Sequence, residues 1–279
     1  MASTAVTRTL GGTGVQVLPV SLGGEGILRT TGRSRQAVPV ILEALRLGVR
    51  YCDTAPAYQQ SQDYYGEAFR TVGKASREGV LLASKCHERT RDRALRLLDD
   101  SLRRIGTSYL DTWQMHDLRE MDELDVLTGK GGALQAALEA KADGRIRFVG
   151  LTGHHDPSVL LEAMSRFPFD TVLVAINPAD GRHRPFLPTV VADARKRNMG
   201  VVGMKALSAG QLLAMASVNE LLRYCATHAD TVVVGCSSVE EVRTNLAVAD
   251  DFTPMSKPEQ RTLEERIAPC ASTYDYFKG

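Results

Sequence analysis

Strand-like and helix-like segments alternate along the whole chain, and this alternation constrains the fold more than any other feature. Short apolar runs are each followed by an amphipathic helical pattern, at intervals of roughly 30 residues. In the stretch 34–48, apolar residues follow the i, i+3, i+4, i+7 spacing from Val38 to Leu45, and Gly48 ends the predicted helix. The strand-like runs end near Gly23 and then occupy 49–55, 79–85, 109–116, 146–153, 170–177, 200–206 and 231–236.

This alternation predicts an α/β protein with a parallel sheet. The runs are apolar almost throughout, as is typical of strands buried on both faces, and a helix between successive strands makes those strands parallel. Eight such units in 279 residues favour a closed (β/α)8 TIM barrel over an open sheet. We predict an N-terminal β-hairpin within 7–24 and, because no linker interrupts the pattern, a single domain over 1–279.

The balanced charge excludes two classes of partner. A formal net charge of +1 gives no sign of the excess positive charge with which proteins bind nucleic acid or an anionic membrane. No apolar run approaches the roughly 18 residues of a membrane span, and the N-terminus lacks the apolar core of a signal peptide. The five scattered cysteines show no paired spacing, which favours a reducing compartment. We therefore expect a cytoplasmic protein.

Polar residues gather where the predicted strands end. In such a barrel the C-terminal strand ends form one rim, and active sites lie there. Asp53 ends the second strand with Tyr58 just beyond it, Lys85 ends the third and His116 the fourth. Each alone has an ordinary explanation, such as a turn carboxylate, a packed aromatic or a core histidine, although a buried lysine needs a partner. On consecutive strands, the four together predict an active site.

These four residue types suit proton transfer to a carbonyl oxygen. A phenol with a pKa near 10 is a poor acid at neutral pH. A cation about 4 Å away is worth roughly 4 kcal/mol at an effective dielectric of 20, so Lys85 would lower the pKa of Tyr58 by a few units, less what burial takes back. Asp53 would keep Lys85 charged. A histidine on the next strand, His116, can orient and polarise the substrate carbonyl.

The motifs around these residues resemble those of the aldo/keto reductase superfamily, and the resemblance covers nearly the whole chain. It is carried by "RYCDTAPAY", "ASKCHER", "LDTWQMHD" and "GRIRFVGLTGHH". It implies an enzyme that transfers hydride reversibly between NADP(H) or NAD(H) and a small aldehyde, ketone or sugar, in the reducing or the alcohol- or lactol-oxidising direction. It also implies roles: Tyr58 is the general acid, Lys85 its pKa-lowering partner, Asp53 the counter-ion of Lys85, and His116 the carbonyl orienter.

The dinucleotide would be held without a Rossmann fingerprint. The "GGTG" near Gly11 precedes a strand and not a helix, so it lacks the required context. In the family the loops after strands seven and eight hold the cofactor, and the second of these opens a helix whose N-terminus favours phosphate. Ordinary loop and capping roles are the alternative for both. The cofactor-binding residues that the resemblance implies are Gly24, Thr152, Gly153, Asn177, Met204, Lys205, Leu207, Gly210, Cys236, Ser237, Ser238, Glu241, Arg243 and Asn245.

Several of these positions depart from the family pattern. Gly153 stands where many relatives use an asparagine on the nicotinamide amide, and Asn177 would replace a glutamine on strand six. Met204 occupies the place of a stacking tyrosine. Glu241 would suit the free 2′-hydroxyl of NAD, whereas Arg243 would suit the 2′-phosphate of NADP, so the cofactor preference stays open.

Two other functions remain as alternatives. A metal-dependent barrel hydrolase would use histidines on the rim, a set comprising His87, His116, His154, His155 and His183. Adjacent side chains on an extended backbone point in different directions, however, so His154 and His155 would seldom share an ion, and we expect no metal ligands. The second alternative is a regulatory barrel that binds nicotinamide without turnover.

Some properties stay open at this stage. These are the identity of the substrate, the physiological direction of the reaction and the oligomeric state. The C-terminal stretch 268–279 either folds over the barrel mouth and lines the substrate pocket, or it packs elsewhere or is disordered.

Overall fold

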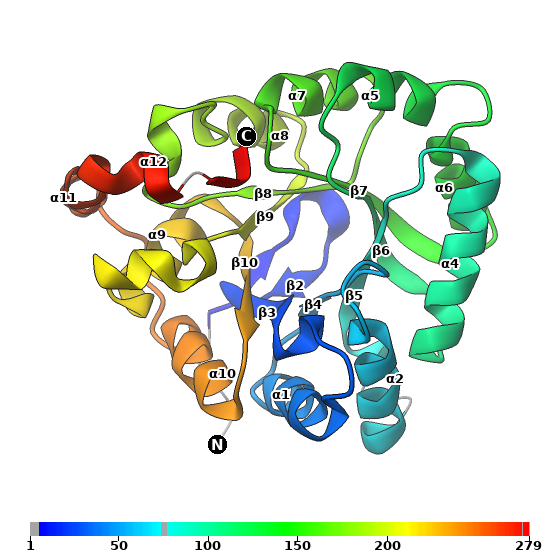
Figure 1. Cartoon of the computed structure of the whole chain (residues 1–279), viewed down its shortest axis with the longest axis horizontal. Coiled ribbons are helices and arrows are strands. Elements are labelled where there is room, and N and C mark those ends of the chain that lie inside the picture. Colours follow the sequence, from blue (N-terminus) through cyan, green and yellow to red (C-terminus); the bar gives the residue numbers. More distant parts are fainter. Residues whose placement is uncertain (1–5, 74–76, 275, 279) are drawn as a thin grey trace.

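The computed structural model describes residues 6–73, 77–274 and 276–278. Its centre is a closed barrel of parallel strands in the order β10-β3-β4-β5-β6-β7-β8-β9, ringed by helices (Figure 1). This confirms the predicted (β/α)8 barrel. The barrel strands are β3 (Val20–Gly26), β4 (Tyr51–Asp53), β5 (Leu81–Cys86), β6 (Leu110–Met115), β7 (Ile146–Gly153), β8 (Thr171–Ala175), β9 (Gly200–Met204) and β10 (Thr231–Cys236).

Amphipathic helices cover the outer face of the barrel. In α4, for example, Ala94, Leu98 and Ile105 are buried on one side, and Gly106 ends the helix in a left-handed conformation. Among the described helices none is long and apolar enough to cross a membrane. The helices are α1 (Ser34–Arg46), α2 (Ser61–Val72), α4 (Arg91–Ile105), α5 (Met121–Thr128), α6 (Ala133–Ala142), α7 (Pro157–Arg166), α8 (Ala192–Lys196), α9 (Val218–His228), α10 (Val239–Leu246), α11 (Lys257–Ile267) and α12 (Ala271–Tyr274).

The charged stretch 117–132 after β6 predicts a solvated loop from its sequence, but the structure contains the helix α5 there. Glu120 and Glu123 form a reciprocal capping box at its N-terminus. Leu124 and Leu127 are fully buried and attach the helix to the core. The expectation of a loop was wrong because it weighed the charges and overlooked the cap and the apolar spacing.

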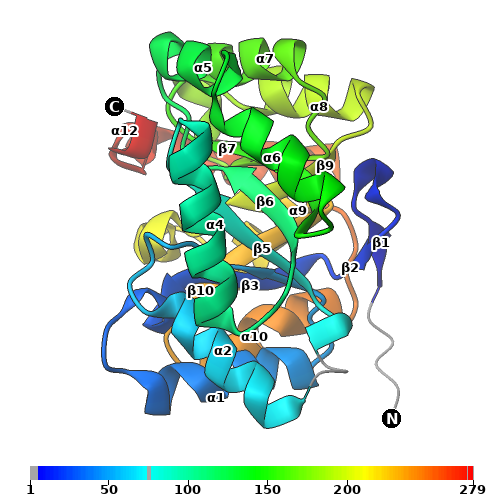
Figure 2. The same cartoon turned by 90° about the vertical axis from the view of Figure 1, so that its right-hand side faces the viewer.

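The predicted hairpin closes the N-terminal end of the barrel. Its strands β1 (Arg8–Thr9) and β2 (Gln16–Val17) pair antiparallel, and Leu10 and Val17 pack against inward-facing side chains such as Tyr51. Gly11 lies so close to the barrel that an added Cβ would be 2.2 Å from the backbone nitrogen of Gly200. The hairpin and the C-terminus lie at opposite ends of the barrel, so the C-terminal mouth stays clear of this plug (Figure 2).

The strand register turns the polar residues into the barrel. Asp53 pairs with Ala83 on β5, and Lys85 lies two residues further along that strand. Since side chains two residues apart point to the same face, Asp53 and Lys85 both point inward at the mouth. Lys85 in turn pairs with Gln114 on β6, whose Nε2 donates to the Tyr51 hydroxyl at 2.9 Å inside the barrel.

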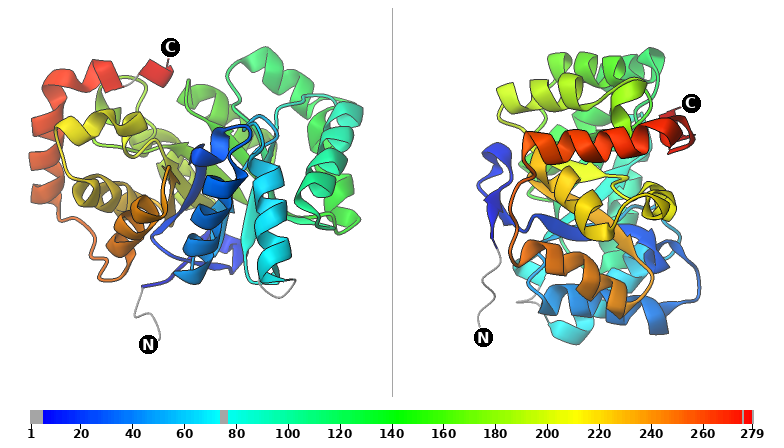
Figure 3. Two further views of the ribbon diagram at one scale, coloured as in Figure 1. Left: turned by 60° about the horizontal axis from the view of Figure 1, so that its bottom comes forward. Right: turned by 90° about the vertical axis from the view of Figure 1, so that its left-hand side faces the viewer.

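The C-terminal segment folds back over the mouth. After α11, which packs on α9 through Leu263 and Ile267, the chain turns toward the loops that follow β7 and β8 (Figure 3). Lys278 is 1% exposed and its Nζ lies 2.5 Å from Oδ1 of Asp180. This confirms, for the described part of 268–279, the expectation that it folds over the mouth; residues 275 and 279 lie outside that part.

Candidate active site at the barrel mouth

A buried ion pair forms the floor of the mouth. Lys85 Nζ donates to Asp53 Oδ2 at 2.5 Å and to the Thr54 carbonyl at 3.0 Å. The side chains of Lys85 and Asp53 are 1% and 4% exposed. Burial alone lowers the pKa of Lys85, but the Asp53 carboxylate and Tyr58 outweigh it and raise that pKa above its ordinary value. Lys85 is therefore an ammonium ion held at a fixed point.

Tyr58 lies directly beside this ammonium. Lys85 Nζ is 4.5 Å from the centre of the Tyr58 ring. Loss of hydration raises the pKa of Tyr58 above 10, while Lys85 opposes that rise. The expected net lowering is thus wrong because burial outweighs the cation, although Lys85 acts in the expected direction.

Gly24 is the residue that lets Tyr58 occupy this place. A Cβ on Gly24 would lie 2.4 Å from Cδ2 of Tyr58, closer than carbon atoms approach. Arg29 covers the ring from another side, with its Cζ 5.1 Å from the ring centre. The ring is therefore clamped between a glycine backbone and two cations. The role of Gly24 that this geometry supports is to seat Tyr58.

His116 completes the group on the next strand. Its ring meets that of Tyr58 edge to face, with the centres 5.9 Å apart. Burial, assisted by the charge of Lys85, holds the pKa of His116 well below its usual value. His116 is therefore a neutral imidazole at pH 7, able to donate one N–H to a carbonyl oxygen. The four residues predicted from strand ends come together at one point of the rim.

The loop after β9 has an unusual backbone that suits an anion. Lys205, Ser208, Ala209 and Gly210 all have positive φ, between 45° and 86°. Such left-handed residues occur in anion-binding nests, although the N–H groups of Ser208 and Gly210 here donate to the carbonyls of Lys205 and Leu207 at 2.9 Å. Asn177 is fully buried behind the loop, and its Nδ2 donates to the Lys205 carbonyl at 3.2 Å. Met204 and Leu207 border this loop and are half-buried.

The N-terminus of α10 follows β10, and β10 is next to β9 in the barrel. Ser238 caps the helix through its Oγ, and the Ser237 N–H donates to Glu241 Oε2 at 2.7 Å. Glu241 is therefore committed to capping. Asn245 points inward, where its Nδ2 lies 3.3 Å from Sγ of Cys236.

Arg243 projects from the same helix toward α1. Its Nε lies 2.7 Å from Oε1 of Glu43, yet its side chain is 54% exposed. Arg46 holds the other oxygen of Glu43 at the same distance. These two arginines lower the pKa of Glu43 to about 2.

Comparison with known proteins identifies the family. Residues 19–220 match the profile of the aldo/keto reductase family. The chain belongs to the aldo/keto reductase family. It is similar to L-galactose dehydrogenase of Arabidopsis thaliana, with 26% identity over 92% of each chain.

Solved structures of aldo-keto reductases share the fold of this reductase. One from Bacillus halodurans (holo form) superposes with a TM-score of 0.77 at 22% identity, covering 94% of this chain and 96% of that one. Another from Klebsiella pneumoniae, in complex with NADP and acetate, gives a TM-score of 0.75 at 22% identity, covering 93% and 95%. The expectation of a nicotinamide-dependent oxidoreductase is confirmed by the family, and the hydrolase alternative loses its support.

Thr152 and Gly153 of the reductase organise the loop next to His116. The Thr152 hydroxyl accepts from the Asp117 N–H and its carbonyl accepts from the Leu118 N–H, both at 3.0 Å. A Cβ on Gly153 would lie 2.9 Å from Leu160. The carbonyl oxygen of Leu118 would lie 3.0 Å from the same Cβ, so the glycine lets these segments pack closely.

Two groups at the mouth had no clear signal in the sequence. Ser208 Oγ donates to the Tyr274 carbonyl at 2.9 Å, which ties the β9 loop to the C-terminal segment. Nδ1 of His154 lies 3.1 Å from the carbonyl oxygen of Phe277. These contacts join residues far apart in the chain, so local patterns could not reveal them.

Proposed function

We propose that the reductase converts a small aldehyde, ketone or sugar carbonyl to the alcohol with NADPH, and that Tyr58 is its general acid. The observation that carries this proposal is the contact of Tyr58 with the Asp53–Lys85 ion pair beside neutral His116. It is a site where a proton donor, a fixed cation and a second N–H donor lie together.

The residues would divide the work as follows. The substrate oxygen accepts hydrogen bonds from the Tyr58 hydroxyl and the His116 N–H, which polarises the carbonyl. As negative charge develops on that oxygen, the Tyr58 proton moves to it. The ammonium of Lys85 then stabilises the phenolate by roughly 4 kcal/mol at about 4 Å and an effective dielectric of 20, which offsets the cost of burial. Asp53 keeps that ammonium charged throughout.

The nicotinamide cofactor, when bound, supplies the hydride. The loop 205–210, with its positive φ angles, would lie against its pyrophosphate. The N-terminus of α10 at Ser238 suits a second phosphate. Gly24 would lie beneath Tyr58. The residues proposed to surround the cofactor are Thr152, Gly153, Asn177, Met204, Lys205, Leu207, Gly210, Cys236, Ser237, Ser238, Glu241, Arg243 and Asn245.

We favour NADP(H) over NAD(H). The Glu241 carboxylate, which would suit a free ribose hydroxyl, is already bonded to the Ser237 N–H. Arg243 keeps an exposed guanidinium, and the Klebsiella relative was solved with NADP. Arg243→Ala should raise the KM for NADPH about 10-fold or more and leave that for NADH unchanged. Arg46→Ala removes the other partner of Glu43 and should alter neither; equal effects of both variants would refute the assignment.

The broader setting is proposed from the same features. The Arabidopsis relative is named a sugar dehydrogenase, which makes aldoses and their lactols the first substrates to test. We propose one domain over 1–279. A reducing, cytoplasmic setting fits five free cysteines, and the charge of +1 offers nothing to nucleic acid.

The test is a spectrophotometric screen of aldehydes, ketones and sugars with NADPH and NADH, repeated with Tyr58→Phe. The variant should lose roughly 10²–10⁴-fold in kcat while binding NADPH as before. Tyr109→Phe, which removes a hydroxyl at the opposite end of the barrel, is the matched control. Full kcat in Tyr58→Phe would contradict the acid role, and tight cofactor binding without turnover on any substrate would favour a regulatory barrel.

A further inference from the structure

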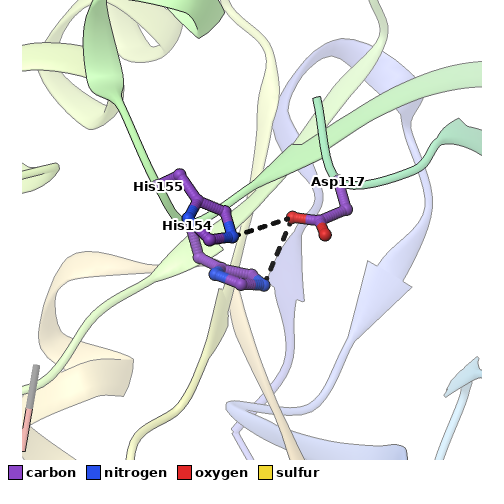
Figure 4. A group of neighbouring side chains, drawn as sticks. All are labelled: Asp117, His154 and His155. Carbon is purple, nitrogen blue, oxygen red and sulfur yellow. Dashed lines mark ion pairs between the residues drawn. The ribbon is translucent and has the colours of Figure 1, made fainter. Parts of the chain in front are cut away.

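A cluster of three potential metal ligands lies at the mouth, just outside the catalytic group. Asp117 follows β6, and His154 and His155 follow β7 (Figure 4). Nε2 of His154 is 3.3 Å from Oδ1 of Asp117, and Nε2 of His155 is 3.8 Å from the same oxygen. One ligand atom from each residue fits within a span of 4.8 Å.

The backbone brings the two histidines together against the sequence-based expectation. That expectation assumed an extended chain, but β7 ends at Gly153 and residues 154–155 form a bend. The two rings then lie with their centres 4.6 Å apart and tilted by only 33°. Both therefore present a nitrogen to the same carboxylate oxygen.

The hydrogen bonding of His154 fixes which nitrogen is free to bind a cation. Its Nδ1 lies 3.1 Å from the carbonyl oxygen of Phe277, which can only accept, so Nδ1 carries the hydrogen. In the neutral ring Nε2 then has a free lone pair and no hydrogen. It faces a carboxylate oxygen of Asp117, so two acceptor atoms face each other. A backbone carbonyl on the second nitrogen is the usual way in which proteins orient a metal-binding histidine.

Within the described part of the chain, two polar atoms of the cluster have no hydrogen bond to satisfy them. Oδ1 of Asp117 and Nε2 of His155 are buried atoms without a hydrogen-bond partner among the described residues.

The carboxylate is held in place for this role. Arg119 Nε and Nη2 donate to Oδ2 of Asp117 at 2.9 and 2.6 Å, which leaves Oδ1 toward the histidines. The Asp117 N–H donates to Thr152 Oγ1, and its φ of 51° turns the side chain back over the mouth. The positive charge of Arg119 weakens cation binding, but it also makes the oxygen atom a fixed ligand.

We propose that Asp117, His154 and His155 bind a divalent transition metal ion, for which Zn²⁺ is the best match. Ligands at about 2.1 Å from a tetrahedral Zn²⁺ lie roughly 3.4 Å from one another, close to the 3.3 and 3.8 Å found here. Two imidazoles and one carboxylate are a common set for such ions. The three side chains keep about a fifth of their surface exposed, although the ligand atoms of Asp117 and His155 are buried.

An ion at this place would connect three parts of the mouth. Asp117 directly follows His116, and Nδ1 of His154 contacts the carbonyl oxygen of Phe277 in the C-terminal segment. Bound metal would stabilise that segment against the loop after β7. The proposal is independent of hydride transfer, because the chemistry at Tyr58 uses no metal, and it replaces the expectation from the sequence that no residue serves as a metal ligand.

The test is a titration of chelator-treated, full-length protein with ZnCl₂ alone, followed by calorimetry, with Co²⁺ absorption as a measure of tetrahedral geometry. The wild type should bind about one ion and gain thermal stability. His155→Gln and Asp117→Asn should each weaken binding by at least the roughly 10–100-fold that the loss of a supporting contact costs. His183→Gln and Cys270→Ser remove an exposed histidine and the most exposed thiol and should bind as the wild type does.

The outcomes separate clearly. Loss of the site in His155→Gln or in Asp117→Asn, with circular dichroism spectra like that of the wild type, supports the proposal even if the other variant misfolds. Wild-type affinity in both variants, loss of the site in a control variant, or no saturation up to roughly 1 mM Zn²⁺ would overturn it.

Discussion

Replacing Lys85 by methionine tests whether the ion pair is the centre of the site. The change removes the ammonium from a position 2.5 Å from Asp53 and leaves a carboxylate that is 4% exposed without its cation. Breaking a buried pair by removing one partner costs about 3–5 kcal/mol. For a chain of this size, that corresponds to a fall in Tm on the order of 10 °C.

The double variant Asp53→Asn/Lys85→Met provides the matched control. It removes the charge that the single variant leaves unpaired, while the shapes of the side chains stay similar. We expect it to recover much of the lost stability, since replacing both members of a buried pair is often neutral. Denaturant unfolding at pH 7.5 measures all three proteins. A single variant as stable as the wild type, or a double variant as unstable as the single one, would refute the reasoning.

The pH dependence gives a second check on the same perturbation. Burial already raises the Asp53 pKa, and the loss of Lys85 removes the main opposing influence. In Lys85→Met the folded state then binds a proton that the unfolded state, with a pKa of about 3.9, does not bind. Stability therefore falls as pH rises from about 4 through the raised pKa. The gap between wild type and variant should narrow toward pH 4, and a constant gap would exclude Asp53 as its cause.

Three further predictions follow from contacts at the mouth. Gly24→Ala places a Cβ 2.4 Å from Tyr58, so kcat should fall at least about 10-fold. The far-ultraviolet circular dichroism spectrum should stay like that of the wild type. Unchanged kinetics would contradict the role of Gly24 in seating Tyr58. Lys278→Met leaves Asp180, 1% exposed, without its cation, and should cost about 3–5 kcal/mol in denaturant unfolding, which Asp180→Asn/Lys278→Met should partly restore. His116→Gln removes a group whose pKa in the folded state lies well below its value of about 6.5 in the unfolded state. The wild type therefore loses folding stability as pH falls through about 6.5. The variant should lose less free energy of unfolding between about pH 7 and 5.

The sequence by itself determined the barrel and the identity of its rim. Strand and helix periodicities are local properties, and eight alternating units leave few topologies, so the fold followed from spacing. Because parallel strands end on one rim, the positions of Asp53, Lys85 and His116 at strand ends placed them together before any coordinates were known. Tyr58 follows Asp53 by five residues and is predicted on the same rim, and the family motifs added the assignment of a role to each residue.

The tertiary structure decided what depends on distant segments and on the degree of burial. The net pKa direction of Tyr58 reverses the expectation because desolvation is set by packing, which spacing does not encode. Arg243 meets Glu43, 200 positions away, and Lys278 meets Asp180, 98 positions away. The bend after β7 turns two adjacent histidines toward one carboxylate, where an extended strand would separate them. A side chain's partners are set by the closed barrel, since closure brings together loops that are remote in the chain.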